Sequence, residues 1–263
     1  MDFSVNARLL EKGIKWDSNF FLSFVTDKVT SYKVNGSVTN YLQSDAVGIF
    51  PLVGKPLYGI YSYAWAGLDP VNGNPMGYYN GVPSTEYNLM ATAATVDNIV
   101  YHGSARPEYY GAWRNTFNWR NFSLSANISF RFKYFFRKNS IYYGEVYGLN
   151  GHGDYQLRWK KTGDEQHTQV PSIPATPNLS RDNFYQYSSV LIEKGDHIRF
   201  QDLKIGYDLN KLNFRNFPFQ SIQCYLYADN IGLIWKANSA GIDPDYITGP
   251  ASRSIALGAK LSF

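Results

Sequence analysis

The sequence predicts an all-β fold: about seven strands of an antiparallel transmembrane β-barrel with long extracellular loops. Three observations favour this class. Residues 121–134 alternate between apolar and polar side chains without exception. The connections between such segments alternate between short and long. Finally, 17% of the residues are aromatic and only 17% are charged, which suits a chain whose lipid-facing and lumen-facing positions average to mild polarity.

The bulk composition excludes several other classes. The formal net charge of +4 is small and Lys and Arg form no long run, so we expect no nucleic-acid partner. No apolar stretch reaches the roughly 18 residues that a membrane-spanning helix needs. The single Cys224 excludes an intrachain disulfide. A mean hydropathy of −0.34 leaves two classes open, a membrane barrel and a soluble, aromatic-rich β protein.

The clearest strand is predicted at residues 121–134. Its even positions are apolar, from Phe122 to Tyr134, and its odd positions are polar, from Asn121 to Lys133. A period of two indicates a strand with two different faces. The run exceeds the usual strand of about 5–6 residues and fits the roughly 9–11 tilted residues that cross a bilayer. The polar face suits a wet lumen.

Weaker copies of this pattern occur elsewhere, as expected of a protein built from such strands. In residues 14–24, Ser18 interrupts the apolar face and Phe21 lies on the other face. Residues 197–209 alternate less cleanly, and the last predicted strand, residues 252–263, ends on Phe263. The remaining predicted strands are residues 3–9, 110–119 and 222–229.

The connections predict which strand ends face outward. Residues 11–13 and 120–121 form tight turns and residues 210–220 a moderate connection, whereas residues 26–109, 135–196 and 232–251 are long. Outer-membrane barrels have short periplasmic turns and longer extracellular loops. We therefore expect the three long segments outside, and the final strand to run toward the periplasm.

Five stretches in order make the sequence resemble the C-terminal barrel portion of SusC-like (RagA-like) TonB-dependent outer-membrane transporters of Bacteroidetes. They are residues 59–75 (GIYSYAWAGLDPVNGNP), 107–124 (PEYYGAWRNTFNWRNFSL), 158–173 (RWKKTGDEQHTQVPSI), 189–209 (SVLIEKGDHIRFQDLKIGYDL) and 225–246 (YLYADNIGLIWKANSAGIDPDY). Two positions depart from the family pattern. His197 replaces an aromatic residue, and residues 234–236 replace a Thr-containing run.

The resemblance implies a barrel of roughly 22 strands in the bacterial outer membrane, of which residues 1–263 supply the C-terminal part. The plug domain and the N-terminal strands are expected outside this chain, which is either a fragment or one piece of a split barrel. The implied partners are a SusD-like surface lipoprotein, the TonB complex through the missing plug, the remaining barrel strands and outer-membrane lipid. The implied function is import of oligosaccharides or peptides, with no cofactor and no catalysis.

Candidate ligand-contacting residues are the aromatic side chains of the long loops, because aromatic faces suit sugar rings and peptide side chains. Packing of loop against loop is the alternative for each of them. Trp16, Trp113, Trp119 and Phe263 are instead expected in the interfacial girdles of the barrel. The loop candidates are Tyr61, Tyr63, Trp65, Tyr78, Tyr79, Tyr109, Trp159 and Trp235.

No catalytic or metal-binding constellation stands out. The four His residues have no metal-ligand spacing with one another or with Cys224. Asp69, with its neighbours Asn72 and Asn74, and the pair Asp243 and Asp245 are the nearest to cation sites, but they lack EF-hand periodicity. We expect them to form turns.

Two alternative functions remain open on the sequence. One is a secreted β-sandwich that binds glycans through its aromatic loops, in which the apolar strand faces would pack on one another. The other is a passive porin or adhesin barrel without energy coupling. A lipid-exposed apolar face would separate the first alternative from a barrel, and TonB coupling would separate the second from an importer.

Overall fold

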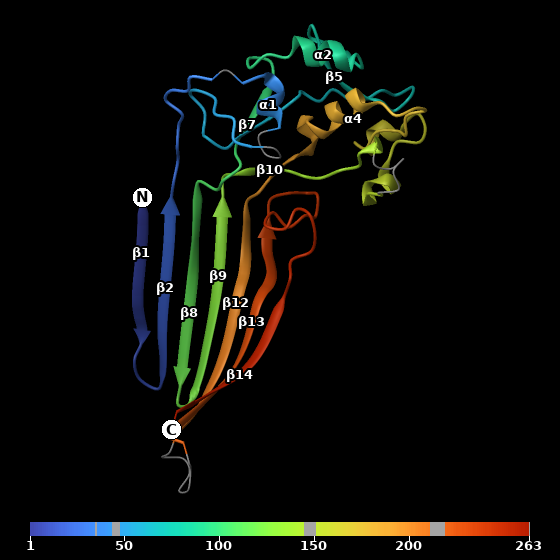
Figure 1. Cartoon of the computed structure of the whole chain (residues 1–263). Coiled ribbons are helices and arrows are strands. Elements are labelled where there is room, and N and C mark those ends of the chain that lie inside the picture. Colours follow the sequence, from blue (N-terminus) through green and yellow to red (C-terminus); the bar gives the residue numbers. More distant parts are fainter. Residues whose placement is uncertain (35, 44–47, 145–150, 211–218, 263) are drawn as a thin grey trace. The chain divides into compact units, whose positions relative to one another are not determined.

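The computed structural model describes residues 1–34, 36–43, 48–144, 151–210 and 219–262. The chain forms two compact units (Figure 1). Unit 1 comprises Met1–Thr26, Pro107–Tyr134 and Gly195–Phe263, and unit 2 comprises Asp27–Arg106 and Phe135–Lys194. The predicted terminal position of Phe263, and most of the predicted connection at 210–220, lie outside the described residues.

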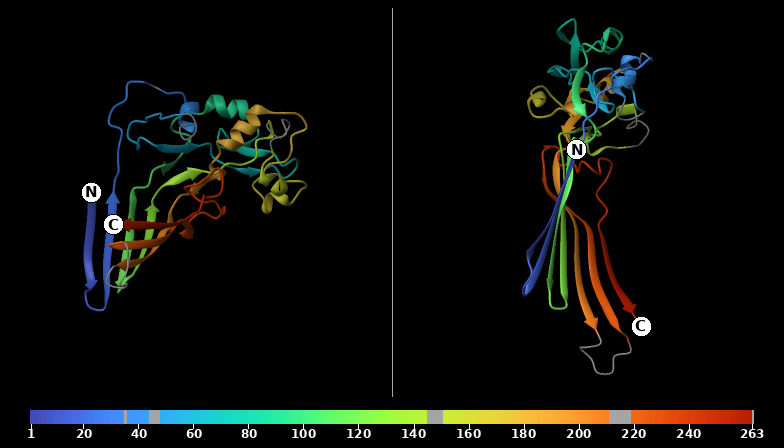
Figure 2. Two further views of the ribbon diagram at one scale, coloured as in Figure 1. Left: turned by 60° about the horizontal axis from the view of Figure 1, so that its bottom comes forward. Right: turned by 90° about the vertical axis from the view of Figure 1, so that its left-hand side faces the viewer.

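Unit 1 is a 7-stranded antiparallel sheet in which the strands lie in the order in which unit 1 uses them along the chain. Figure 2 shows the strands side by side and twisted. This meander follows the predicted strand order. The strands are β1 (Asp2–Leu10), β2 (Ile14–Phe24), β8 (Tyr109–Trp119), β9 (Phe122–Phe132), β12 (His197–Asn210), β13 (Ser221–Lys236) and β14 (Ser254–Ser262).

Most strand boundaries lie within two residues of the prediction, and two of the differences have a backbone reason. β9 ends at Phe132 because Lys133 adopts a left-handed φ of 63°. Tyr134, expected on the apolar face, is instead buried at 6% exposure. β13 was predicted over 222–229 but extends to Lys236, because its pairing with β12 resumes after the left-handed Asn230.

A β-bulge explains why residues 197–209 alternate poorly. Phe200 pairs with Ile128 and Asp202 with Asn127, which are consecutive in β9, so Gln201 is an extra residue in β12. A bulge of this kind places two residues opposite one. The polar face therefore carries odd-numbered residues before Gln201 and even-numbered residues after it. The sheet stays two-faced although the sequence changes parity.

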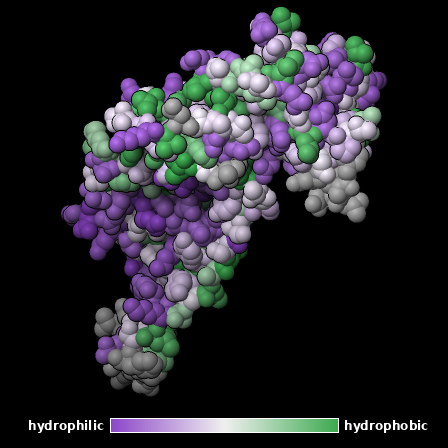
Figure 3. Space-filling view, turned by 45° about the horizontal axis from the view of Figure 1, so that its top comes forward, coloured by the Kyte–Doolittle hydropathy of each residue, from purple (hydrophilic) through white to green (hydrophobic). Residues whose placement is uncertain are grey.

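The two faces of the sheet differ in chemistry. Large apolar side chains of one face are exposed, among them Phe3 at 50%, Ile255 at 78% and Leu257 at 84%. The other face carries ion pairs and hydrogen bonds between Arg, Asp, Asn and Gln side chains. Figure 3 shows a continuous hydrophilic area of the surface in purple. Within the described part of unit 1 there is one sheet, and no second layer covers its apolar face.

Unit 2 is a small mixed body of short elements, formed by two of the segments that were expected to be long loops. Its strands pair as β3–β7, β10–β11 and β4–β5–β6. None of the helices in the described residues has the length and hydropathy of a membrane-spanning helix. The elements are α1 (Val38–Leu42), β3 (Gly59–Ser62), β4 (Gly67–Leu68), β5 (Pro75–Tyr79), β6 (Val82–Ser84), α2 (Tyr87–Ala93), β7 (Val100–Ser104), β10 (Phe135–Arg137), η1 (Gly153–Leu157), η2 (Asp164–Gln166), α4 (Leu179–Gln186), η3 (Ser189–Leu191) and β11 (Ile192–Lys194).

Both chain segments of unit 2 contribute to its core. The Arg137 guanidinium donates to the carbonyls of Leu42 at 3.1 Å and Tyr61 at 2.8 Å. Arg181 is only 2% exposed and donates to Asn74 Oδ1 at 2.7 Å. Buried guanidinium groups need such partners to offset the cost of losing water. The two segments therefore hold each other in place.

Candidate functional site

The apolar face of the sheet carries aromatic pairs near both ends of its strands. At the end with the tight turns, the rings of Trp16 and Phe117 stack with centroids 5.4 Å apart. At the opposite end, Phe24 contacts Tyr109 with centroids 4.7 Å apart, and Phe132 contacts Trp235 at 6.3 Å. Paired aromatic belts are typical of the two interfaces of a membrane barrel.

The spacing of the belts fits a bilayer. Strand β8 carries Tyr109 at one end and Trp119 at the other, ten residues later. At about 3.3 Å per residue they are about 33 Å apart along the strand, and a tilt of about 45° would reduce this to about 23 Å along the normal of a bilayer. The apolar band of outer-membrane barrels is about 25 Å tall.

Two residues expected in the outer loops belong to this face instead. Tyr109 begins β8 and is 37% exposed, and Trp235 lies in β13 and is 47% exposed. Trp235 had been placed in a loop because β13 extends beyond its predicted end, and Tyr109 because β8 begins one residue earlier than predicted. Trp113 also differs from its expected girdle position, since it lies in the middle of β8.

Trp113 and Trp16 satisfy the polar groups that interrupt the apolar face. Ser18 lies directly opposite Asn115 in the β2–β8 pair. The Trp113 indole donates to Ser18 Oγ at 2.9 Å, and the Trp16 indole donates to Asn115 Oδ1 at 3.0 Å. A polar group without a partner is costly in an apolar environment. Ser18, which interrupts the apolar pattern of the sequence, therefore has a hydrogen-bond partner on the apolar face.

The polar face holds a buried carboxylate that the sequence analysis did not single out. Asp202 is 5% exposed and accepts two hydrogen bonds from the Arg114 guanidinium, at 3.1 and 3.0 Å. Asn127 donates to the same carboxylate at 2.9 Å. This bidentate pair links three strands across the face. The signal in the sequence was the change of parity at Gln201.

Asp243 and Asp245 hold the loop between β13 and β14 to the polar face. Arg199, 1% exposed, pairs with Asp243 and contacts Asp245 at 3.3 Å. His197 lies 3.2 Å from Asp245, which also pairs with Arg131. Burial opposes ionisation of Asp245, but the hydrogen bond from His197 and the charge of Arg131 outweigh it, so its pKa is lowered. Both carboxylates are thus neutralised by cationic side chains.

The Asp69 region forms turns. Asp69 Oδ1 accepts from the Val71 amide at 2.8 Å, and Asn72 Oδ1 accepts from the Asn74 amide at 2.9 Å. Such bonds from a side chain to the backbone two residues later define Asx-turns. Among the described residues no three His, Cys, Asp or Glu side chains gather in a way that would hold a metal ion.

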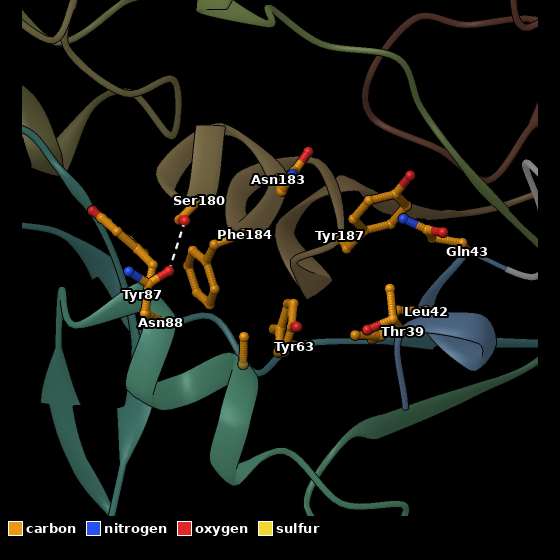
Figure 4. A pocket seen from close by; sticks show the side chains of 11 residues that line it. Thr39, Leu42, Gln43, Tyr63, Tyr87, Asn88, Ser180, Asn183, Phe184 and Tyr187 are labelled. Atoms are coloured by element: carbon orange, nitrogen blue, oxygen red, sulfur yellow. Dashed lines mark hydrogen bonds between the residues drawn. The ribbon is translucent and has the colours of Figure 1, made fainter. Parts of the chain in front are cut away.

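Unit 2 contains an aromatic groove made of two pockets, both lined by Tyr63 and Phe184. The two rings lie 5.3 Å apart between centroids. The first pocket, about 170 Å³, is bordered by Asn88 and Ser180 on one side of this ring pair and by Thr39, Leu42, Gln43 and Tyr187 on the other (Figure 4). The second pocket, about 330 Å³, is lined by Tyr78, Tyr79, Asn80, Met90 and Asn98 among others.

Local sequence signals shape the groove. Asn80 and Gly81 both have positive φ, 51° and 80°, in the two-residue turn between β5 and β6 that Asn-Gly favours. This hairpin presents Tyr78 and Tyr79. Helix α4 begins after Asn178, whose side chain accepts from the Arg181 amide at 3.0 Å. That cap fixes the start of the helix that carries Phe184.

The structure brings together three of the predicted ligand-contacting residues, Tyr63, Tyr78 and Tyr79, in the second pocket. Burial raises the pKa of the Tyr63 hydroxyl. Tyr61, 2% exposed, and Trp159, 9% exposed, lie in the interior of unit 2. The half-buried Trp65 packs against Tyr185 with ring centroids 6.0 Å apart. These three side chains have packing roles.

Phe184, Gln43 and Asn183 also line the groove, but the sequence analysis did not identify them. Gln43 directly follows α1, whereas Asn183 and Phe184 lie on α4 about 140 residues later in the chain. Neither segment has the alternation or motif that marked the strands. A third pocket of unit 2, about 410 Å³, differs in chemistry, because Lys138, Asp154, Glu165 and His167 line it.

Comparison with solved structures supports the fold of the whole chain. A structure of the RagAB peptide transporter matches all of this chain with a TM-score of 0.69 at 21% identity. Structures of the RagAB peptide importer in the open-open and closed-closed states match with TM-scores of 0.64 at 19% identity. The chain spans only 28–29% of those chains. No protein-family model and no curated protein sequence matches it.

Proposed function

We propose that this chain forms part of the wall and the external loops of an outer-membrane importer of oligosaccharides or peptides. One observation carries the proposal: unit 1 is a single sheet with one exposed apolar face, bounded by aromatic belts, and one polar face. Such a sheet needs lipid on one side and water or polar protein on the other. The likeness to RagAB over the full chain supports the importer class.

The importer would be an assembly. The two edge strands, β1 and β14, each pair on one side only within the described sheet, so further strands must continue it. A plug coupled to TonB and a SusD-like lipoprotein over the outer side would complete the importer, as the resemblance of the sequence to SusC-like transporters implies. The chain itself would enclose and contact substrate without making or breaking bonds.

The proposal that the sheet forms a barrel wall can be tested by labelling neighbouring residues that lie on opposite faces. Ile205 and Lys204 in β12, and Leu257 and Ala256 in β14, form such pairs. Each would be changed to Cys in a Cys224→Ser background, labelled with a fluorophore and reconstituted with brominated lipid as the complete transporter. We expect strong quenching at positions 205 and 257 and little at 204 and 256. Equal quenching within the pairs would refute the lipid-facing assignment.

Energy coupling tests the import role. Cells carrying the complete transporter should lose uptake of its labelled substrate when TonB is removed. Uptake that is unaffected by TonB would support the passive porin instead. The glycan-binding sandwich requires a second sheet over the apolar face, and the described residues of unit 1 form only one.

A further inference from the structure

Among the residues that the structure describes, the groove of unit 2 has no charged lining. None of the described residues lining its two pockets is Asp, Glu, Lys, Arg or His, although the third pocket of the same unit has all these types except Arg. The uncharged lining is therefore a local property of the groove. Its larger pocket, about 330 Å³, lies at the lower end of the roughly 300–1,000 Å³ usual for small-ligand sites.

The groove combines aromatic rings with neutral hydrogen-bonding groups. Asn88 and Ser180 bond to each other at 2.7 Å, whereas no hydrogen bond from the described residues occupies the side chains of Gln43 and Asn183, which line the first pocket. In the second pocket Tyr78 is 49% exposed. Rings and amides are thus available to a ligand along the groove.

We propose that this groove binds a segment of an uncharged oligosaccharide, an inference that rests on the proposed import function. The C–H face of a pyranose ring packs on aromatic rings such as Tyr78 and Tyr63. Its hydroxyl groups form hydrogen bonds to amides such as those of Gln43 and Asn183, in place of hydrogen bonds to water. A peptide would bring charged termini or side chains into a site without counter-charges, which is unfavourable.

Binding to the purified complete transporter in detergent tests this inference. The probes are a neutral gluco-oligosaccharide series, a matched series carrying uronic acids, and a neutral peptide of similar size, each measured by calorimetry. We expect binding of at least one neutral oligosaccharide. Tyr78→Ala and Asn183→Ala should each weaken it by roughly five- to tenfold, the loss of one contact or hydrogen bond. Tyr32→Ala is the matched control, because Tyr32 is 43% exposed in unit 2 and lines neither pocket.

Three outcomes would overturn the inference: no neutral oligosaccharide binds, the peptide binds with the same dependence on Tyr78 and Asn183, or the groove variants behave like Tyr32→Ala. Near-ultraviolet circular dichroism confirms that each variant is folded. The inference fails separately from the proposed function if the lipid-quenching and TonB experiments succeed while the groove variants bind normally. If quenching fails while the groove variants lose sugar binding, the inference survives and the wall proposal does not.

Discussion

The His102 imidazole lies inside unit 2, where burial and the positive charge of Arg137 lower its pKa to about 4. The ring lies 2.7 Å from Ser62 Oγ. In the unfolded chain the same group has a pKa of about 6.5. Below pH 6.5 the imidazole is protonated in the unfolded chain, whereas in the folded chain it stays neutral until about pH 4. The shift therefore makes unit 2 less stable as the pH falls from 6.5 toward 4.

A first prediction follows from the direction of this pKa shift. Between pH 7 and pH 4.5 the full chain in detergent should lose about 1–2 kcal/mol of stability through His102, a figure already reduced for its partial exposure. His102→Gln keeps a hydrogen-bonding group but cannot titrate, so its melting temperature should depend less on pH. The exposed His167 serves as the control, and His167→Gln should behave as wild type. Equal pH dependence in all three proteins would contradict the assignment.

A second prediction concerns the carboxylate opposite Arg199. Asp243→Asn leaves the guanidinium, which is 1% exposed, with Asp245 as its remaining carboxylate partner. We therefore expect a loss of stability below the roughly 3–5 kcal/mol of a fully broken buried pair. We expect the loop at 237–253 to detach and trypsin to cleave after Lys236 or Arg253 at least tenfold faster. Asp97→Asn, at an exposed position, should leave cleavage unchanged. Wild-type resistance in the Asp243 variant would exclude a holding role.

At the scale of elements, the bulge at Gln201 predicts different outcomes for two single-residue deletions. Removing Gln201 leaves Phe200 and Asp202 adjacent, and they already pair with consecutive residues of β9, so both faces stay intact. Removing Ala126 from the middle of β9 turns every residue on one side of it to the wrong face. We predict that ΔGln201 folds with a loss of about 1–2 kcal/mol, whereas ΔAla126 does not fold. The folded fraction after refolding in detergent measures both, and equal failure would argue against the bulge.

The strands were predictable because their signal is local. β2 spans the predicted Ile14–Phe24, because in a two-faced strand the polarity of each residue indicates the face on which it lies. The errors occurred where the backbone departs from regular geometry. Lys133 ends β9 through a positive φ, and Asn230 carries β13 onward through another. A positive φ at a Lys or at a single Asn cannot be inferred from the residue type alone.

Unit 2 was not predictable as a folded body, because its contacts join distant segments. Tyr63 exchanges backbone hydrogen bonds with Tyr187 and Ser189, at 2.8 and 2.9 Å, and packs on Phe184. The sequence indicated long loops rich in aromatic residues and predicted no helix or strand within them. Which aromatic rings are buried depends on pairings over more than 100 residues, and a single sequence does not contain that information.

At the scale of the whole molecule, the exposed apolar face determines how the chain behaves in solution. Side chains such as Phe3, Val5 and Leu257 are 42–84% exposed, and contiguous apolar surfaces of this kind drive association in water. We predict that the full chain is monodisperse in detergent and aggregates when detergent is removed, measured by sedimentation velocity. A monodisperse chain in plain buffer would favour the secreted sandwich.

The division of unit 2 between two chain segments has a consequence for biogenesis. The first segment, Asp27–Arg106, is synthesised before Phe135–Lys194, yet Tyr61 and Leu42 are completed by Arg137 only from the second. Closing such long-range contacts is slow. In an outer-membrane protein of the proposed kind, the earlier segment would keep uncovered aromatic side chains until β9 has been exported, and a periplasmic chaperone would be needed most during this interval.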